Sequence, residues 1–342
     1  MATVLVTGGG GFVGRHIVRR LVARGEDVRT LGRRGYDYLP GEVDQVVGDV
    51  RDQAVLRRAA EGCDAIVHTA ALAGVMAERS AIERINIAGT ANALQAAAAA
   101  NVLAFVYTSS PSVVFGTTGH IAGDESLPYP ERYLDHYPRT KAAAERLVLA
   151  ASDTSDASGG LRTVALRPHL VFGPEDTNLH PRLVDRSRRG RLRIVGRGDQ
   201  PISVAYVENV AAAHLQALDE LRGAGRCRGR AYFINEKQPV ETKAWINTLL
   251  AMAGEPACER HVPARLAYGV GGFLETAWRV FARADEPPMT RFVAKQLSEP
   301  HSFRTAAAER DFGYCPPVSW AEALGRTERW ARARFASESE GD

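Results

Sequence analysis

A tyrosine and a lysine four positions apart, Tyr137 and Lys141, are the residues of this sequence whose types and spacing are best suited to chemistry. Pro138 fits the first turn of a helix, and residues four apart lie on one helix face. A nearby ammonium disfavours the protonated phenol, so Lys141 is expected to lower the pKa of Tyr137 and prepare the pair for proton transfer. Chance gives such a spacing in about one comparable sequence in ten, so its context matters.

Hydroxyl groups gather upstream of this pair, where the apolar run Ala104–Tyr107 continues into Thr108-Ser109-Ser110-Pro111-Ser112. If the run is a parallel strand, its carboxyl end faces the ligand crevice. We expect Ser110 to donate a hydrogen bond to a substrate carbonyl oxygen and to stabilise the charge that develops there. Ser109 and Ser112 are the alternatives for this role, and simple capping of the strand end is the alternative without function.

Glycines follow the first apolar run at a spacing that suits a phosphate-binding turn. Gly8, Gly11 and Gly14 precede an amphipathic segment in Thr7-Gly8-Gly9-Gly10-Gly11-Phe12-Val13-Gly14. Such glycines allow a tight turn, close approach of the backbone to a pyrophosphate and close packing of helix on strand, and the helix N-terminus supplies free N–H groups. A flexible turn is the alternative, but the position between a strand and a helix favours dinucleotide binding.

The second apolar run indicates which dinucleotide is bound. It ends in Gly32-Arg33-Arg34, with Gly32 at the position where NAD sites usually have a carboxylate. A guanidinium can hold a 2′-phosphate through two hydrogen bonds, whereas a carboxylate would repel it. The sequence therefore predicts NADP(H), with Arg15 as a third contact. NAD(H), with both arginines as solvated loop charges, is the alternative.

Short apolar runs alternate with Ala- and Arg-rich segments through the first half of the chain. Strands are expected at Val4–Val6, Val28–Leu31, Gln45–Val47, Ala65–His68, Ala104–Thr108, Thr163–Leu166 and Ala231–Ile234, and helices at Val13–Ala23, Ala54–Ala60, Ile82–Ala99 and Pro138–Ala151. This alternation predicts an α/β fold, a Rossmann-type doubly wound parallel sheet with a smaller C-terminal substrate-binding lobe. Residues 1–170 would form the NADP-binding domain. Residues 171–342 would form the lobe, interleaved with elements that return to the main sheet.

Composition limits the classes of partner. The 43 basic and 40 acidic residues give a net charge of +3, which offers no basic footprint for nucleic acid. The four cysteines are scattered without CxxC pairs, so we expect no metal site, no disulfide framework and a cytoplasmic location. The chain opens on a strand-like run rather than a signal peptide, and the apolar stretch 265–284 is too interrupted by charge to cross a membrane.

Taken together, these residues resemble the extended short-chain dehydrogenase/reductase superfamily over most of the chain. The motifs occur in the family's order as Thr7-Gly8-x-x-Gly11-x-x-Gly14, Gly48-Asp49-Val50, His68-Thr69-Ala70-Ala71, Asn86, Thr108-Ser109-Ser110, Tyr137-x-x-x-Lys141 and Arg167-Pro168-x-x-Val171-Phe172-Gly173-Pro174. The resemblance implies a catalytic triad of Ser110, Tyr137 and Lys141. It also implies a homodimer through the helices that contain Asn86 and Tyr137, and leaves open a place in a larger biosynthetic assembly.

The same resemblance implies a set of cofactor contacts. They are Gly8, Gly11, Phe12, Val13 and Gly14 at the phosphates, Arg33 and Arg34 at the ribose, Asp49 and Val50 beside the adenine, Ala70 and Ala71 along the cofactor, Lys141 at the nicotinamide ribose, and Pro168, Leu170 and Val171 near the nicotinamide.

Within the superfamily the chain resembles the 3β-hydroxysteroid dehydrogenase branch, and is most similar to the 3-keto acid reductases of long-chain olefin and β-lactone biosynthesis. Segments that carry this likeness are Tyr107–Phe115, Pro128-Tyr129-Pro130, His136-Tyr137-Pro138, Tyr206–Ala211, His301-Ser302-Phe303 and Phe312-Gly313-Tyr314. Nucleotide-sugar epimerases and dehydratases are the main competitor. They usually have an arginine where this chain has Ile202, which cannot pair with a diphosphate, although Arg193 or Arg197 could substitute.

Our hypothesis is the NADPH-dependent reduction of the 3-keto group of a long-chain, 2-alkyl-branched β-keto acid. Leu72, Ser112, His169 and Arg197 are candidate substrate contacts, with a core histidine and a plain surface loop as alternatives. The apolar residues of Leu266–Phe281 would line a greasy channel, present a helix to a partner, or simply pack in the core. The rival functions are a hydroxysteroid dehydrogenase, a sugar-nucleotide epimerase and a non-catalytic NADP-binding protein.

Overall fold

A seven-stranded parallel sheet forms the centre of the computed structural model, which describes residues 3–73, 78–116, 118–153, 160–281 and 287–339. The strand order is β12-β7-β5-β4-β1-β2-β3, which reverses direction at β1 as in doubly wound folds. The strands are β1 (Thr3–Thr7), β2 (Asp27–Gly32), β3 (Asp44–Val47), β4 (Ala65–His68), β5 (Ala104–Thr108), β7 (Arg162–Pro168) and β12 (Arg230–Ile234).

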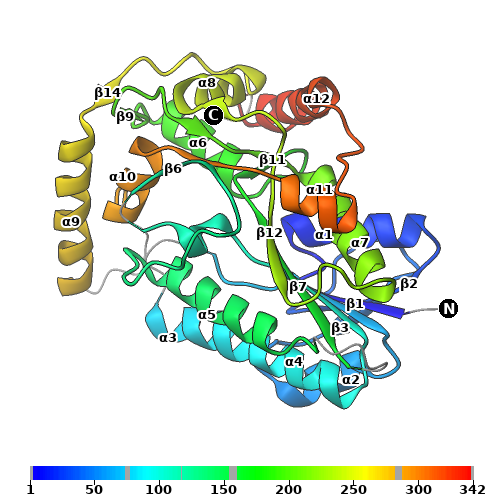
Figure 1. The fold of residues 1–342 in the computed structure, drawn as a ribbon. Helices are drawn as coiled ribbons and strands as arrows, with labels where there is room; N and C mark the ends of the chain where they lie inside the picture. Colours follow the sequence, from blue (N-terminus) through cyan, green and yellow to red (C-terminus); the bar gives the residue numbers. More distant parts are fainter. Residues whose placement is uncertain (1–2, 74–77, 117, 154–159, 282–286, 340–342) are drawn as a thin grey trace.

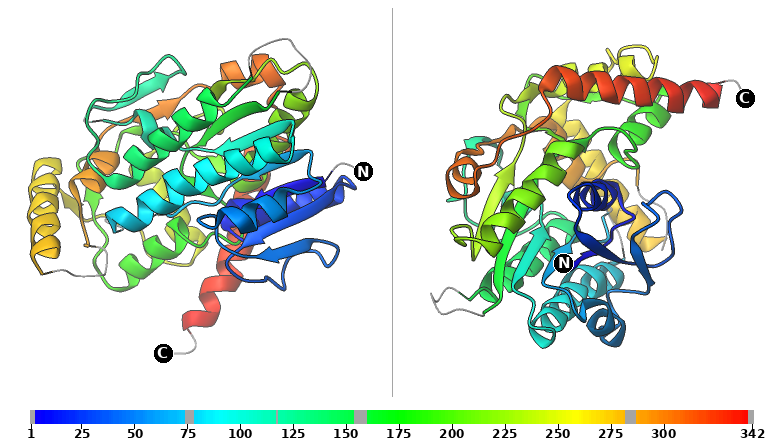
Figure 2. Two further views of the ribbon diagram at one scale, coloured as in Figure 1. Left: turned by 90° about the horizontal axis from the view of Figure 1, so that it is seen from below. Right: turned by 90° about the vertical axis from the view of Figure 1, so that its right-hand side faces the viewer.

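Helices cover both faces of this sheet and make three layers (Figures 1 and 2). On one face α1 (Phe12–Ala23) packs beside α7 (Val207–Arg222), and α11 (Ala306–Phe312) joins them. The other face carries α2 (Gln53–Ala60), α4 (Gly89–Ala99) and α5 (His136–Ala150). The central strands are buried on both faces, which explains why their sequences are continuous apolar runs rather than alternating ones.

A smaller lobe covers the carboxyl ends of the strands; it is built mostly from the second half of the chain, but its sheet also takes β6 from within the expected 1–170 domain. Its four-stranded sheet has the order β13-β10-β15-β6, and two strand pairs, β8 with β11 and β9 with β14, accompany it. These strands are β6 (His120–Gly123), β8 (Val171–Phe172), β9 (Ile194–Val195), β10 (Pro201–Ile202), β11 (Ala205–Tyr206), β13 (Val240–Glu241), β14 (His261–Val262) and β15 (His301–Phe303). The helices are α6 (Leu179–Arg188), α8 (Thr242–Met252), α9 (Ala264–Val280), α10 (Arg291–Ser298) and α12 (Trp320–Ser339).

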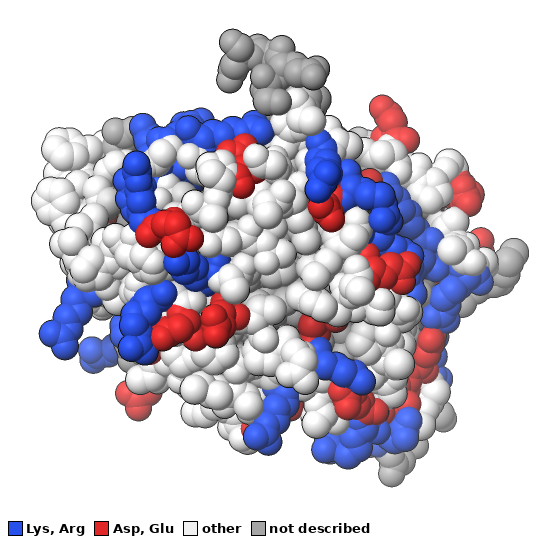
Figure 3. All heavy atoms as spheres, turned by 90° about the horizontal axis from the view of Figure 1, so that it is seen from above, with Lys and Arg blue, Asp and Glu red and all other residues white. Residues whose placement is uncertain are grey.

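The structure confirms the predicted fold class, and each expected strand is present within a residue or two of its expected ends. One expected helix, 82–99, consists of three joined segments: α3 (Arg79–Glu83), a π-helical turn η1 (Arg84–Ala88) and α4. Among the described residues, no helix is long and apolar enough to span a membrane. Acidic and basic side chains are interspersed over the face in Figure 3, with no broad field of one sign.

Candidate active site

The helix α5 brings Tyr137 and Lys141 to the carboxyl end of β5. It begins at His136, and the Asp135 side chain caps it by accepting a hydrogen bond from the Tyr137 backbone N–H at 2.8 Å. Tyr137 is half-buried, whereas Lys141 is only 2% exposed. The predicted helix therefore places the phenol where a ligand can reach it and the ammonium behind it.

Of the three candidate serines, the structure brings Ser110 to the tyrosine. Ser110 precedes the 3-10 turn η2 (Pro111–Val114) and accepts a hydrogen bond from the Ser112 N–H at 3.2 Å. Its hydroxyl lies close enough to Tyr137 to lower the pKa of the phenol. Ser109 and Ser112 are both 4% exposed, and within the described residues their hydroxyls have no hydrogen-bond partner. This geometry favours Ser110 as the group that would share a substrate oxygen with the phenol.

Lys141 is held by the end of β5. Its Nζ donates a hydrogen bond to the Thr108 carbonyl oxygen at 2.5 Å and lies 4.2 Å from the centre of the Tyr107 ring. Burial lowers the pKa of Lys141 to about 7, against the opposing attraction of Glu145. The group is therefore close to half-protonated at neutral pH.

The expected lowering of the Tyr137 pKa is not what the structure shows. Burial raises the pKa of this phenol, and the hydrogen bond with Ser110 offsets the rise only in part. The sequence argument assumed a fully charged ammonium beside an accessible phenol. In the structure both groups are partly or wholly desolvated, and the lysine is itself biased towards its neutral form.

A buried ion pair that the sequence analysis missed supports the catalytic helix. Arg167 donates two hydrogen bonds to Glu145, at 2.7 and 3.0 Å, and the Tyr129 hydroxyl donates a third at 2.6 Å. Glu145 is one helical turn beyond Lys141, and Arg167 is the last residue but one of β7. The i, i+4 spacing of lysine and glutamate, with an arginine in the Arg-Pro motif, was the available signal.

Asn86 joins the loop after β4 to the catalytic helix. Its side chain accepts from the Leu72 N–H at 2.8 Å and donates to the Leu72 carbonyl and the Thr140 hydroxyl, both at 3.1 Å. The buried amide sits in the π-helical turn η1. Leu72 is thereby fixed beside α5, consistent with its expected place near the substrate. Residues 74–77 of the same loop lie outside the described residues.

The glycine turn after β1 has the close contacts that the spacing predicted. Gly8 has a φ of +72°, and a Cβ there would meet the Ala70 backbone at 2.9 Å. At Gly14 a Cβ would meet the Gly8 carbonyl oxygen at 2.2 Å. The N-terminus of α1, beginning Phe12 and Val13, has no side-chain cap and no acidic residue in its first turn. Its N–H groups are thus suited to a pyrophosphate.

The end of β2 presents arginines, as predicted, but also two tyrosines that sequence reasoning missed. Arg33 and Arg34 are exposed, and Arg34 lies over the Tyr36 ring at 5.3 Å. A Cβ at Gly10 would meet that ring at 2.2 Å, and the Tyr38 hydroxyl donates to the Gly10 carbonyl at 2.7 Å. The tyrosines therefore cover the glycine turn where an adenosine ribose would approach.

Arg15, the third predicted contact, stacks on the Tyr38 ring at 4.4 Å and lies 3.6 Å from Glu175. Arg15 therefore lies beside the glycine turn, and its guanidinium is already paired with Glu175.

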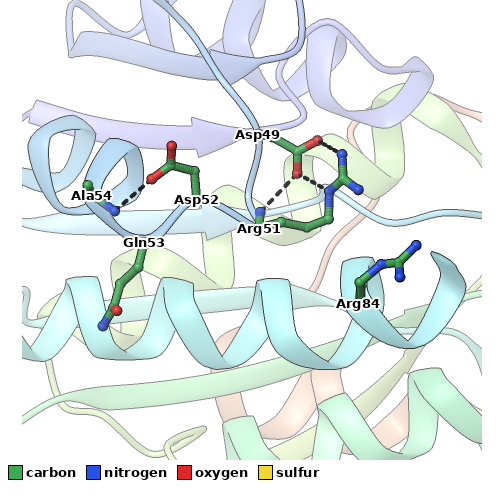
Figure 4. Close-up of a pocket in the computed structure, with 6 residues that line it drawn as sticks. All are labelled: Asp49, Arg51, Asp52, Gln53, Ala54 and Arg84. Carbon is green, nitrogen blue, oxygen red and sulfur yellow. Dashed lines mark hydrogen bonds and ion pairs between the residues drawn. The ribbon is translucent and has the colours of Figure 1, made fainter. Parts of the chain in front are cut away.

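Asp49 and Val50 follow β3 beside an open pocket that Figure 4 shows from close by. Both oxygens of Asp49 accept hydrogen bonds from the Arg51 side chain, and these bonds are the main reason that the pKa of this carboxyl is lowered. Arg84 reaches toward the same hollow from η1. Val50 is buried under Gly89. A contact of Asp49 with the adenine stays a prediction.

The turn after β7 has a strained residue at the place expected for the nicotinamide. Leu170 has a φ of +41°, which is unfavourable for a branched side chain and is found most often at functional turns. Pro168 ends β7 and Val171 begins β8, so these residues bracket the strained position between the sheet and the lobe. Ala70 and Ala71 follow β4, and Ala71 is exposed.

His169 is buried in a pair with His301. The Nε2 of His301 lies 2.6 Å from the Gln296 carbonyl oxygen and must carry a proton, so its Nδ1 accepts from the His169 Nε2 at 2.5 Å. Burial lowers the pKa of both rings, to about 4 for His301. Its burial and its pairing with His301 favour the alternative that His169 is a core histidine rather than a substrate contact.

Arg197 and the apolar segment 266–281 are the other substrate candidates. The Arg197 side chain is 86% exposed and pairs with Asp199 at 2.9 Å, so it does not replace the missing diphosphate arginine, and Ile202 is buried. On and just after α9 several large apolar side chains are exposed, Phe273 to 72% and Phe281 to 75%, whereas Tyr268, Leu274 and Trp278 are partly buried. Helix α9 stands at the edge of the molecule (Figures 1 and 2).

Comparison with known proteins identifies the family and the relatives to which this chain is similar. A model of the 3-beta hydroxysteroid dehydrogenase/isomerase family matches residues 5–263. A 2-alkyl-3-oxoalkanoate reductase from Shewanella oneidensis is 42% identical over 94% of this chain and 84% of that protein, and one from Stenotrophomonas maltophilia is 41% identical over 94% and 97%. A 3 beta-hydroxysteroid dehydrogenase/Delta 5→4-isomerase from Mycobacterium tuberculosis is 34% identical over 95% and 89%.

Among solved structures, the dTDP-glucose 4,6-dehydratase DesIV from Streptomyces venezuelae, with NAD bound, is 26% identical with a TM-score of 0.73 and covers 98% of both chains. The sugar-nucleotide enzymes therefore share the scaffold, while the reductases named above share more of the sequence.

Proposed function

Because the chain belongs to the 3-beta hydroxysteroid dehydrogenase/isomerase family of extended short-chain dehydrogenases and is an oxidoreductase, we propose that it reduces the 3-oxo group of a long-chain 2-alkyl-3-oxo acid. The observation that carries this is the joint position of Ser110, Tyr137 and Lys141 at the end of β5. The substrate class is supported by the two reductases at 41–42% identity, which exceed the steroid enzyme at 34%.

The cofactor we propose is NADP(H). Gly8, Gly14 and the uncapped start of α1 fit a pyrophosphate. The exposed Arg33 and Arg34, without a carboxylate on Gly32, fit a 2′-phosphate. When bound, NADPH would supply the hydride that adds to the carbonyl carbon.

The side chains of this site would then handle the carbonyl oxygen. Ser110 donates a hydrogen bond to it and stabilises the developing negative charge. Tyr137 donates its phenolic proton to that oxygen as the C–O bond becomes an alcohol, and Lys141 holds the cofactor ribose and biases the phenol. The reverse oxidation uses the same groups with the proton passing back to Tyr137.

We further propose a homodimer formed through the helices that contain Asn86 and Tyr137, and a cytoplasmic location. Both rest on the family resemblance and on the scattered, unpaired cysteines.

Substrate turnover tests the function directly. Consumption of NADPH and of NADH should be followed against 2-alkyl-3-oxo acids, keto-steroids and nucleotide sugars. We expect turnover of the oxo acids with NADPH. Preference for steroids would favour a hydroxysteroid dehydrogenase, and tightly retained NAD with sugar turnover would favour an epimerase.

The Tyr137→Phe variant tests the chemistry. Loss of the phenolic proton should lower kcat by about a thousandfold, in line with general acid catalysis, while the Kd for NADPH measured by fluorescence changes little. Unchanged turnover would refute the role of Tyr137.

A further inference from the structure

A pocket of about 360 Å³ adjoins the start of the catalytic helix, on the side that faces α9 and α10. Its wall includes Asp135 and His136, the two residues that precede Tyr137. Four arginines from four different helices complete it: Arg79 of α3, Arg139 of α5, Arg279 of α9 and Arg291 of α10. The pocket thus joins the catalytic helix to the outer helices of the lobe.

Three carboxylates balance these four guanidinium groups incompletely. Glu83 contacts both Arg79 and Arg139, and Glu275 binds Arg291 at 2.8 Å. The third carboxylate is Asp135, the cap of α5. Arg279 forms no ion pair with any residue that the structure describes. Among the residues that the structure describes, one positive charge is therefore in excess, and Arg279 carries it.

The positive charges of these arginines affect His136. The pKa of its imidazole is lowered, first because burial disfavours the charged ring, and then because Arg139, Arg79 and Arg279 repel a second cation, while Asp135 pulls the other way. The imidazole is neutral at pH 7 and can donate or accept a hydrogen bond beside the arginines.

We propose that this pocket binds the carboxylate of the substrate. The assignment rests on the proposed function, because a 3-oxo acid carries a carboxylate and a neutral steroid does not. The carboxyl carbon of such an acid is two bonds from the reacting carbonyl carbon, so its site must lie close to Tyr137, and the wall of this pocket includes Asp135 and His136 immediately before it. One carboxylate neutralises the excess charge, and a guanidinium fits its two oxygens.

Such a contact persists from the bound substrate to the transition state. It therefore contributes to KM and leaves kcat nearly unchanged. Because Arg279 is exposed, its attraction for an approaching anion should also weaken with salt.

The test compares an acid with its ester in the Arg279→Gln variant. Oxidation of the 2-alkyl-3-hydroxy acid with NADP⁺ avoids the unstable 3-oxo acid, and the methyl ester lacks the charge. We expect the KM of the acid to rise about tenfold, as for loss of one charge-assisted hydrogen bond. The kcat for the acid, and both constants for the ester, should stay within about twofold on the same grounds. Arg57→Gln, an exposed arginine of α2, is the matched control and should change none of them.

Direct binding measurements distinguish an error in the pocket assignment from an error in the proposed function. Calorimetric titration of the acid should show the same weakening in Arg279→Gln, and added inorganic phosphate should compete with the acid but not with the ester. If the parent enzyme oxidises the acid but Arg279→Gln binds it equally well, the pocket assignment is wrong and the proposed function stands. If the parent oxidises neither acid nor ester and accepts steroids, both are wrong. An equal rise of KM for acid and ester would show a structural effect and would also overturn the assignment.

Discussion

Replacing Lys141 by methionine should stabilise the protein while it destroys activity. The pKa of Lys141 falls from an ordinary 10.5 to about 7 because the group is buried. At about 1.36 kcal/mol per pH unit, keeping the ammonium charged in this site costs the folded state roughly 5 kcal/mol. Methionine has a similar length and carries no charge. It loses the hydrogen bond to Thr108 and the contact with the Tyr107 ring, each worth about 1–2 kcal/mol.

The net gain should depend on pH in a defined direction. Between pH 7 and 10.5 the unfolded chain binds a proton at this lysine that the folded chain does not, so the stability of the parent protein rises with pH across that window. Below pH 7 both states are protonated and the penalty is complete. Lys141→Met should therefore exceed the parent by about 1–3 kcal/mol at pH 6, with the advantage shrinking towards zero by about pH 9.

Urea unfolding of parent and variant at pH 6, 7, 8 and 9 measures this difference. Lys237→Met, an exposed lysine, is the control and should show no such pH dependence. Turnover of the Lys141 variant should fall by about a hundredfold or more, the loss expected when a residue is kept for catalysis at the expense of stability. A variant that is less stable than the parent at pH 6, or a gain that is independent of pH, would refute the argument that Lys141 is a desolvated cation.

Two sets of substitutions test the choices made among neighbouring residues. Ser110→Ala should lower kcat by about a hundredfold, the usual loss of an oxyanion donor. Ser109→Ala and Ser112→Ala should keep kcat within about threefold, because their hydroxyls do not contact the phenol. A larger loss of kcat in Ser112→Ala would assign the role to Ser112 instead. Arg33→Gln combined with Arg34→Gln should weaken NADPH by about a hundredfold, one charged contact each, and leave NADH nearly unchanged. Equal weakening of both cofactors, measured by fluorescence titration, would count against 2′-phosphate recognition.

The sheet and the motif positions were predictable because they depend on local sequence. Buried parallel strands are continuous apolar runs, and the glycine spacing between β1 and α1 follows from backbone approach alone. The same local reasoning placed Tyr137 and Lys141 on one helix face. It favoured Ser110 but left Ser109 and Ser112 as alternatives, since that choice depends on how η2 turns the chain after β5.

Features that depend on contacts between distant segments were not predictable. The partner of Lys141 is a backbone carbonyl, which has no sequence signature, and Glu145 meets Arg167 only because α5 packs on β7. The arginine pocket draws one side chain from each of four helices, between residues 79 and 291. Its residues look like ordinary surface charges until the lobe is folded onto the catalytic helix. For the apolar segment 266–281, the exposure of Leu266, Phe273 and Phe281 argues against a core helix, and a helix presented to a partner stays a prediction.

Burial of the phenol bears on the direction of the reaction. Because burial raises the pKa of Tyr137, the phenol keeps its proton through the physiological pH range. A protonated phenol is the form that reduction requires, since it must deliver a proton to the carbonyl oxygen. Oxidation requires the phenolate, which the raised pKa disfavours at neutral pH, so the oxidation assay with NADP⁺ is run at alkaline pH. The raised pKa therefore keeps Tyr137 in the form that the proposed reduction uses.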